Sequence, residues 1–199
     1  RLLTRSETDR LLARVRQSHP ALVEELVPVV LSAGDVQKVL QNLLREKVSI
    51  RNIDAILETL ADAGRSAKDP SQLTEAVRQR LGHVICQALA GTASELHVLT
   101  LDPAMESRLL QNLQAARKEG LSVTGFVLEP RTVEKFLLQL VQHADRMMKS
   151  NLLPVLLCSP DLRRHLRALS ERTLPHLRVL SMAEVPQAIE LKSFATVSA

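Results

Sequence analysis

Apolar residues recur at helical spacing along the first 90 residues of the chain. The densest example lies between 31 and 61, where a short polar turn separates two apolar stripes. The stripes consist of Val36, Val39, Leu40, Leu43 and Leu44, and then of Ile53, Ile56, Leu57 and Leu60. Residues three and four apart share one face of a helix, so this stretch predicts a helical hairpin. Ser32, followed by Asp35, and Asn52 precede the stripes and are predicted to be N-caps.

Further helices are expected on both sides of this hairpin. Ser6 is predicted to cap a helix that ends near Ser18, and a short helix over 21–27 lies between two prolines. A Gly-, Ser- and Pro-containing loop over 62–70 follows the hairpin. Asp69 or Ser71 then caps a long helix that continues to about residue 89. Residues 1–90 therefore predict an all-helical subdomain, either a small bundle or a winged-helix-like unit.

The pattern changes after a polar link at 91–94. Strand-like apolar runs at 97–101, 125–128 and 153–158 each lead into a polar residue, a proline and a helix. The polar residues Asp102, Glu129 and Ser159 suit N-caps, and a proline suits the first helical position. Runs at 177–180 and 189–197 are expected to close the sheet as a hairpin. Residues 91–199 therefore predict a small α/β subdomain with a mixed sheet, within an α+β chain.

Composition and charge narrow the function classes. Only 2% of the residues are aromatic and none is Trp or Tyr, so stacking platforms for single-stranded nucleic acid are not expected. The formal net charge is +4, and each half of the chain carries 13 basic and 11 acidic residues. A nucleic-acid-binding domain would concentrate basic residues, which this chain does not do. The apolar runs are too short to span a membrane. Cys86 and Cys158 lie far apart and are expected to be buried thiols.

Motifs for chemistry are sparse. The sequence has no Gly-rich phosphate loop and no GxSxG elbow. His83 and Cys86, with His97 as a third candidate, fall short of the three or four ligands of a zinc site. Asp161 and His165 lie four apart on a helix, a spacing that is typical of a solvated face. We therefore predict no catalytic residue, no cofactor and no metal, and a protein that is not an enzyme.

Two alternatives remain open on these residues. A helix-turn-helix DNA-binding protein is disfavoured because Asp54, Glu58 and Asp62 lie on the outer face of the second hairpin helix. A small α/β enzyme would instead place a pocket where the predicted strands end. Its lining would be Asp102, Glu129, Ser159 and His165.

Several strings resemble the FlhA/SctV family, the large export-gate subunits of flagellar and injectisome type III secretion systems. They are Val39-Leu-Gln-Asn-Leu-Leu-Arg-Glu46, Val48-Ser-Ile-Arg51 and Ile56-Leu-Glu-Thr-Leu-Ala61, with further similarity at 12–15, 22–28, 68–70, 73–78, 81–82, 153–158, 174–181, 184 and 195–197. The resemblance spans nearly the whole chain. Leu3-Thr-Arg5 and Phe194-Ala-Thr-Val197 favour the flagellar branch, with an injectisome subunit as the alternative. The segment 121–126 departs from the shorter, glycine-rich lead expected there.

The resemblance implies the C-terminal part of a cytosolic region, at the cytoplasmic face of the bacterial inner membrane. By the resemblance, an N-terminal membrane part would precede it. That the chain opens on Arg1 rather than Met separately suggests a fragment of something longer. The implied partners are further copies of the chain in a ring, usually nine-fold, together with export chaperone–substrate complexes and components of the export ATPase machinery. No nucleic acid is implied. The implied role is a docking and ring-building module.

Exposed cations and one amide are the candidate contact residues. One group lies on the turn of the hairpin, and another lies beyond the first turn of the helix that follows Ser159. An acidic partner or a neighbouring subunit is the ligand that such groups would suit, although ordinary solvated surface accounts for the second group more simply. The candidates are Arg45, Lys47, Arg51, Asn52, Arg163, Arg164 and Arg167.

Overall fold

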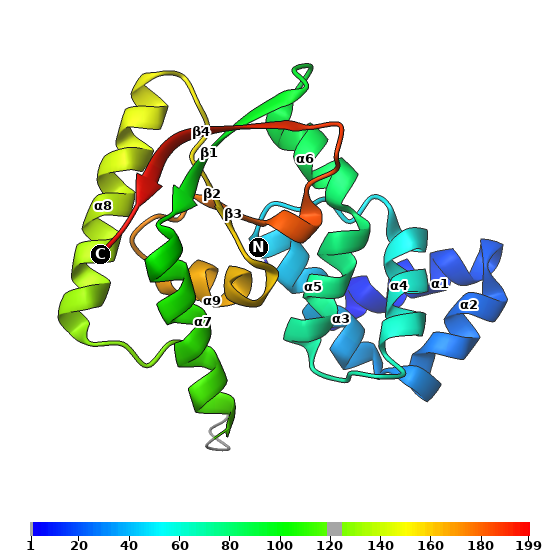
Figure 1. The fold of residues 1–199 in the computed structure, drawn as a ribbon. Helices are drawn as coiled ribbons and strands as arrows, with labels where there is room; N and C mark the ends of the chain where they lie inside the picture. Colours follow the sequence, from blue (N-terminus) through cyan, green and yellow to red (C-terminus); the bar gives the residue numbers. More distant parts are fainter. Residues whose placement is uncertain (1, 119–124) are drawn as a thin grey trace. The chain divides into compact units, whose positions relative to one another are not determined.

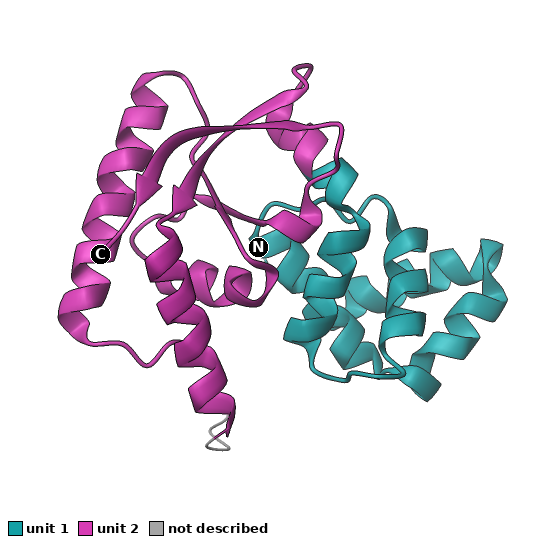
Figure 2. Ribbon diagram, in the orientation of Figure 1, with its two compact units in different colours: residues 1–85 teal, residues 86–199 magenta. Residues whose placement is uncertain are grey.

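The computed structural model describes residues 2–118 and 125–199, which form two compact units (Figures 1 and 2). Unit 1 comprises residues 1–85 and unit 2 comprises residues 86–199. The chain passes from one to the other inside helix α6 (Gly82–Ala90). The sequence predicts this boundary at 90/91, at the end of the same helix.

Unit 1 is helical, and no strand occurs among its described residues 2–85. Its elements are α1 (Arg5–Ser18), α2 (Pro20–Glu25), a π-helical turn η1 (Leu26–Val30), α3 (Ala33–Arg45), α4 (Ile53–Ala63), α5 (Pro70–Arg80) and the start of α6. The predicted all-helical subdomain is therefore confirmed.

The helix starts follow local capping chemistry. Ser32 Oγ accepts a hydrogen bond from Asp35 N at 3.1 Å, and Asp69 Oδ1 accepts one from Ser71 N at 3.1 Å. α1 begins at Thr4 rather than at the predicted Ser6, because Thr4 and Glu7 form a complete capping box. Asn52 occupies the N-cap position of α4 without a capping hydrogen bond from its side chain.

The prediction of one long helix that continues to about residue 89 is wrong, because the structure has two helices there. α5 ends at Arg80, Leu81 is its C-cap, and α6 starts at Gly82. Glycine costs conformational entropy inside a helix, so a break at this position is favourable. The apolar periodicity continues across the break because Val77, Leu81 and Ile85 are all buried.

The hairpin forms the core of unit 1. α5 packs against both α3 and α4, so that the two predicted stripes face a common interior. Leu44, at 39% exposure, is the stripe residue that stays outside. At the end of α4 the backbone passes its neighbours closely. A Cβ atom added to Gly64 would lie 2.6 Å from Leu60 O and 2.7 Å from Val30 Cγ1, so only glycine fits there.

Unit 2 combines a four-stranded sheet with three long helices (Figure 1). Its elements are the end of α6, β1 (Glu95–Leu101), α7 (Pro103–Lys118), α8 (Pro130–Lys149), β2 (Val155–Cys158), α9 (Pro160–Ser170), β3 (Arg178–Ser181), a 3₁₀ turn η2 (Met182–Glu184) and β4 (Glu190–Val197). Pro130 and Pro160 occupy first helical positions as predicted. The α/β subdomain is confirmed.

The predicted mixed sheet is wrong, because the four strands are parallel in the order β3-β2-β1-β4. β4 does not pair with β3. The connection over 182–189 returns to the start of β1, where Glu190 N donates to Ser94 O at 2.9 Å. β4 then runs beside β1 with Leu96 opposite Leu191 and Leu101 opposite Val197.

One face of this sheet carries the main core of unit 2. Leu99, Leu156 and Val179 lie opposite one another across β1, β2 and β3 and are buried. Side chains of α7, α8 and α9 pack against this row, with Phe136 as the largest apolar group. Cys158 lies in this cluster, and both cysteine thiols are buried as predicted.

The strand predicted over 125–128 does not form. Residues 126–129 have no regular secondary structure, and the backbone of Val127 bonds to a side chain instead of a strand. Asn112 Nδ2 donates to Val127 O at 2.6 Å, and Val127 N donates to Asn112 Oδ1 at 3.0 Å. The segment 121–126 departs from the family pattern. Of its residues, 121–124 lie outside the part of the chain that the structure describes.

No helix in the described part of the chain combines the length and the apolarity that a transmembrane helix requires.

Candidate functional site

The turn between α3 and α4 is a defined backbone structure. Val48 N donates to Leu43 O at 2.9 Å and Lys47 N donates to Leu44 O at 3.0 Å, the pair of bonds that defines a Schellman motif. Lys47 occupies the left-handed position with φ 63°. Val48 is buried, so it anchors the turn to the core of unit 1.

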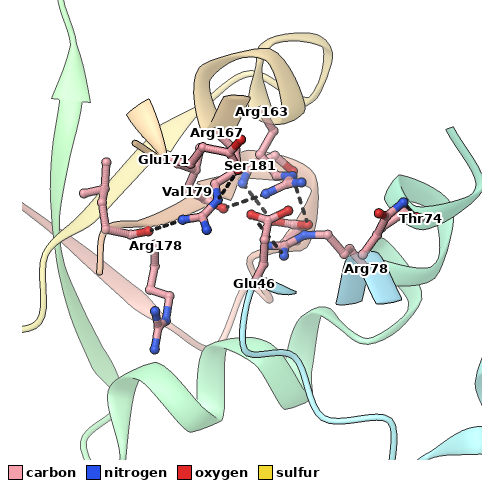
Figure 3. Close-up of polar contacts among 12 residues, drawn as sticks. Glu46, Thr74, Arg78, Arg163, Arg167, Glu171, Arg178, Val179 and Ser181 are labelled. Carbon is pink, nitrogen blue, oxygen red and sulfur yellow. Dashed lines mark hydrogen bonds and ion pairs between the residues drawn. The ribbon is translucent and has the colours of Figure 1, made fainter. Parts of the chain in front are cut away.

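A buried ion pair between Glu46 and Arg78 connects the turn to helix α5. Glu46 lies between two exposed cations, but its own side chain is only 13% exposed and points inward. Its Oε1 lies 3.8 Å from Nη1 of Arg78, a residue of α5 whose side chain is 4% exposed (Figure 3). The turn is therefore rigid, because both its backbone and its central side chain are tied to the core.

The four candidate contact residues of this turn lie where the sequence places them. Arg45, Lys47, Arg51 and Asn52 are all exposed. The backbone beyond the buried Val48 is fixed by a hydrogen bond from Arg51 N to Ser49 Oγ at 3.1 Å. The turn thus presents three cations and one amide on a preorganised segment. Such a group lowers the entropic cost of contacting an acidic surface.

The second candidate group differs from the sequence expectation. Arg163 was expected on the surface, but it is 1% exposed, so the expectation is wrong. Its Nη1 donates to Val179 O at 3.1 Å (Figure 3). Its Nε lies 4.0 Å from Glu184 Oε2. Glu184 is itself 2% exposed, and its Oε1 accepts from Ser181 N at 2.9 Å. Arg163 therefore joins α9 to β3 and η2 inside unit 2.

The other two arginines of this group are partly buried. Arg167 Nη1 donates to Leu177 O at 3.2 Å, and its Nε lies 3.9 Å from Glu171 Oε2. Its side chain is 12% exposed, which leaves little of it for a partner. Arg164 is intermediate in exposure and is the member of the group that remains at the surface.

The residues of the enzyme alternative have structural roles. Asp102 Oδ2 accepts from Met105 N at 3.2 Å and caps α7. Glu129 and Ser159 occupy the N-cap positions of α8 and α9, but neither side chain makes the predicted capping hydrogen bond. The ring of His165 packs against the ring of Phe126 with centroids 5.8 Å apart. Burial, together with the positive charges of Arg164 and Arg117, lowers the pKa of His165.

The metal and DNA alternatives gain no support. Among the described residues, no group of three or more His, Cys, Asp and Glu side chains lies close enough to hold a metal ion. His83 is exposed whereas Cys86 is buried, with its Sγ 3.5 Å from Glu184 O. On α4, Asp54, Glu58 and Asp62 are exposed as predicted and give that helix an acidic outer face.

Sequence reasoning missed the buried ion pairs. Glu46 and Arg78 lie 32 positions apart, and Arg163 and Glu184 lie 21 positions apart, so no local pattern connects them. The available signal was weak: Arg78 follows Val77 on the buried side of α5. An arginine at this position is expected to lie at the solvated edge of the buried face unless its buried acidic partner is known.

The sequence matches the FHIPEP family over residues 1–190. The chain belongs to the FHIPEP family. It is 37% identical over 196 residues to the flagellar biosynthesis protein FlhA of Bacillus subtilis, covering 98% of this chain and 28% of that protein. It is 40% identical to FlhA of Escherichia coli, covering 98% of this chain and 27% of that protein. The chain thus spans little more than a quarter of the length of these relatives.

Several solved structures have a fold similar to that of this chain. The C-terminal domain of InvA superposes with a TM-score of 0.85 at 26% identity, covering 98% of this chain and 57% of that one. The nonameric EscV cytosolic domain from the type III secretion system gives 0.80 at 27% identity, covering 99% and 57%. Chlamydia pneumoniae CdsV, in its complex with CdsO, gives 0.83 at 25% identity, covering 98% and 56%. The family resemblance predicted from the sequence is therefore confirmed.

Proposed function

We propose that this FHIPEP chain is a docking and ring-building module within the cytosolic region of a type III export gate. The observation that carries the proposal is the match of almost the whole chain, in sequence and in fold, to FlhA and to the nonameric EscV cytosolic domain. The flagellar branch is favoured because the curated relatives of 37% and 40% identity are FlhA proteins. The parent protein would act at the cytoplasmic face of the bacterial inner membrane.

The turn between α3 and α4 is the proposed ring contact. Its cations are held in place by the Schellman backbone and by the Glu46–Arg78 pair. In a ring, each subunit presents two different surfaces, so a basic segment of one copy meets a different surface of the next. Arg45, Lys47, Arg51 and Asn52 are the residues assigned to this contact. Arg164 is assigned to cargo or machinery, because it is the candidate arginine of α9 that stays at the surface, with intermediate exposure.

Partners other than the chain itself are also proposed. We infer that the intact cytosolic region receives chaperone–substrate complexes and a component of the export ATPase machinery. CdsV forms a complex with CdsO, which supports the capacity of this fold to bind a second protein.

Charge reversal tests the ring contact. Arg51→Glu in the whole cytosolic region should weaken ring assembly, measured by sedimentation velocity, and should reduce export in cells. Arg80→Glu is the matched control, because Arg80 is also an exposed cation of unit 1 but lies outside the turn. Normal assembly and export by both variants would make the turn purely structural.

Chaperone retention tests the docking role. The whole cytosolic region, immobilised, should retain export chaperones loaded with their substrates. Deleting the segment that corresponds to residues 1–199 should abolish that retention. Unchanged retention would leave this part of the region a scaffold only.

A further inference from the structure

Strand β3 forms one edge of the sheet in unit 2. On its inner side, Arg178 N donates to Pro154 O at 3.1 Å, at the start of the pairing with β2. The backbone groups of successive residues in a parallel strand point alternately toward one neighbour and then the other. Those of residues 177, 179 and 181 therefore point away from β2. An outward row of this kind is a template on which another strand can pair.

Two arginines of α9 occupy the carbonyl oxygens of this edge. Arg167 Nη1 donates to Leu177 O at 3.2 Å. Arg163 Nη1 donates to Val179 O at 3.1 Å (Figure 3). The two arginines are four positions apart, so they extend from the same face of α9. Each oxygen that a further strand would need as an acceptor is thus already bonded to a guanidinium.

Outward N–H groups at the two ends of the strand are bonded as well. Leu177 N donates to Leu174 O at 3.2 Å, and Ser181 N donates to Glu184 Oε1 at 2.9 Å. The same carboxylate also lies beside one of the arginines, with its Oε2 4.0 Å from Arg163 Nε. Side chains from α9 and η2 therefore act together along the β3 edge, and all of these contacts lie within unit 2.

The opposite edge of the sheet, β4, is protected by different means. The register between β1 and β4 shifts once, which leaves Phe194 as an extra residue in β4. Such a bulge twists an edge strand away from pairing, and the exposed Lys192 adds a charge to it. In contrast, β3 pairs with β2 over residues 178–181 without a register shift. The protection of the β3 edge therefore depends on side chains.

We propose that Arg163, Arg167 and Glu184 close the β3 edge and so prevent a second copy of the chain from adding a strand there. This edge guard goes beyond the docking and ring-building role proposed above. In a ring, neighbouring copies are held at a high effective concentration. An open edge would then compete with the ring contact, because strand addition needs only backbone groups, which every copy supplies.

Opening the edge at Arg167 tests the proposal. Arg167→Met removes the donor and keeps a long side chain, and Arg167→Gln, which is shorter by two atoms, is a second opening variant should the first not fold. In sedimentation velocity, the mean mass of the folded full chain should rise with concentration toward about twofold, as edge-paired dimers form by mass action. Amide hydrogen exchange over 177–181 should slow at the same concentrations, because strand pairing protects backbone amides. Arg163 stays unchanged, since its burial makes its loss destabilising.

Two matched variants separate opening of the edge from loss of charge. Arg167→Lys retains a donor at the same position, and Arg172→Met removes an exposed cation just after α9. Both should behave like the unchanged chain. Opening variants that are folded and do not associate more than the unchanged chain would overturn the proposal. Equal association by Arg172→Met, or association without slower exchange over 177–181, would overturn it as well.

A further variant distinguishes edge pairing from the ring contact. Combined with Arg51→Glu, which is expected to weaken ring assembly, Arg167→Met should still associate through the β3 edge. Loss of that association in the double variant would assign it to the ring contact and reject the edge guard. Association that persists would support the edge guard whether or not the turn between α3 and α4 is the ring contact.

Discussion

His165 illustrates how its surroundings decide the chemistry of a single side chain. The sequence offered it as half of a pair with Asp161, yet burial against Phe126 and the charges of Arg164 and Arg117 outweigh Asp161 and lower its pKa. A histidine held neutral in this way contributes to packing.

The lowered pKa of His165 predicts a pH dependence of stability. The unfolded chain takes up the proton near the ordinary pKa of histidine, whereas the folded chain resists it until lower pH. The unfolded state therefore binds more protons as the pH falls from about 7.5 to 5.5, and the free energy of unfolding decreases. His165→Gln should show a smaller decrease in urea unfolding over the same range. Identical pH profiles for both proteins would contradict the assignment.

The buried pair Arg163–Glu184 predicts a large effect of single substitutions. Arg163→Leu should lower the free energy of unfolding by about 3–5 kcal/mol, because it removes a buried guanidinium that donates to Val179 O and lies beside the buried carboxylate of Glu184. The double variant with Glu184→Gln should recover part of this loss, since the amide oxygen can still accept from Ser181 N. Arg164→Leu, on the same helix but partly exposed, should change stability by less than about 1 kcal/mol. Urea unfolding measures all three, and equal effects of Arg163→Leu and Arg164→Leu would contradict the role of burial.

At the scale of elements, close backbone approach makes two glycines behave differently. Gly64 ends α4 against Leu60 O and Val30, whereas a Cβ at Gly34 would meet Arg5 Nη1 at 3.4 Å and Ser32 Oγ at 3.7 Å. Gly64→Ala should therefore destabilise the chain by about 1–3 kcal/mol through overpacking. Gly34→Ala, inside α3, should stabilise it by up to about 1 kcal/mol. Thermal unfolding of the two variants should shift in opposite directions, and a shared direction would refute the packing argument.

The segment before α8 depends on one side chain of α7. Asn112 makes two hydrogen bonds with the backbone of Val127 in place of a strand partner. Asn112→Ala should cost about 1–2 kcal/mol and raise amide hydrogen exchange at Val127, because each bond contributes roughly 0.5–1.5 kcal/mol. Gln111→Ala, one position away and exposed, is the control. Unchanged exchange at Val127 in the Asn112 variant would mean that other contacts fix the segment.

Local sequence patterns predict where individual helices begin and which face they bury, but they do not predict which strands pair. The stripes of α3 and α4, the caps at Ser32 and Asp69 and the prolines that open α8 and α9 are local features, and the structure confirms them. The pairing of β4 with β1 was not predictable in this way. Two adjacent apolar runs suggest a hairpin, but the connection between β3 and β4 is long enough to reach another strand.

At the scale of the whole molecule, the proposed ring contact predicts salt sensitivity. The proposed contact residues of the turn include three exposed cations, Arg45, Lys47 and Arg51. Screening shortens the reach of such charges from about 10 Å at 0.1 M salt to about 3 Å at 1 M. Assembly of the whole cytosolic region should therefore weaken as salt rises in sedimentation velocity. Arg51→Glu should flatten this dependence, and a salt-independent ring would assign assembly to apolar contacts.

The sequence by itself determined the family, the helical first unit and the strand-and-helix second unit. These follow from periodicity, capping residues and motif strings, which act over a few neighbouring positions. The tertiary structure alone decided that the sheet is parallel, that residues 125–128 stay outside it and that Arg163 and Arg78 are buried. Each of these depends on a partner more than ten positions away, because burial and strand pairing are made by residues that only the fold brings together.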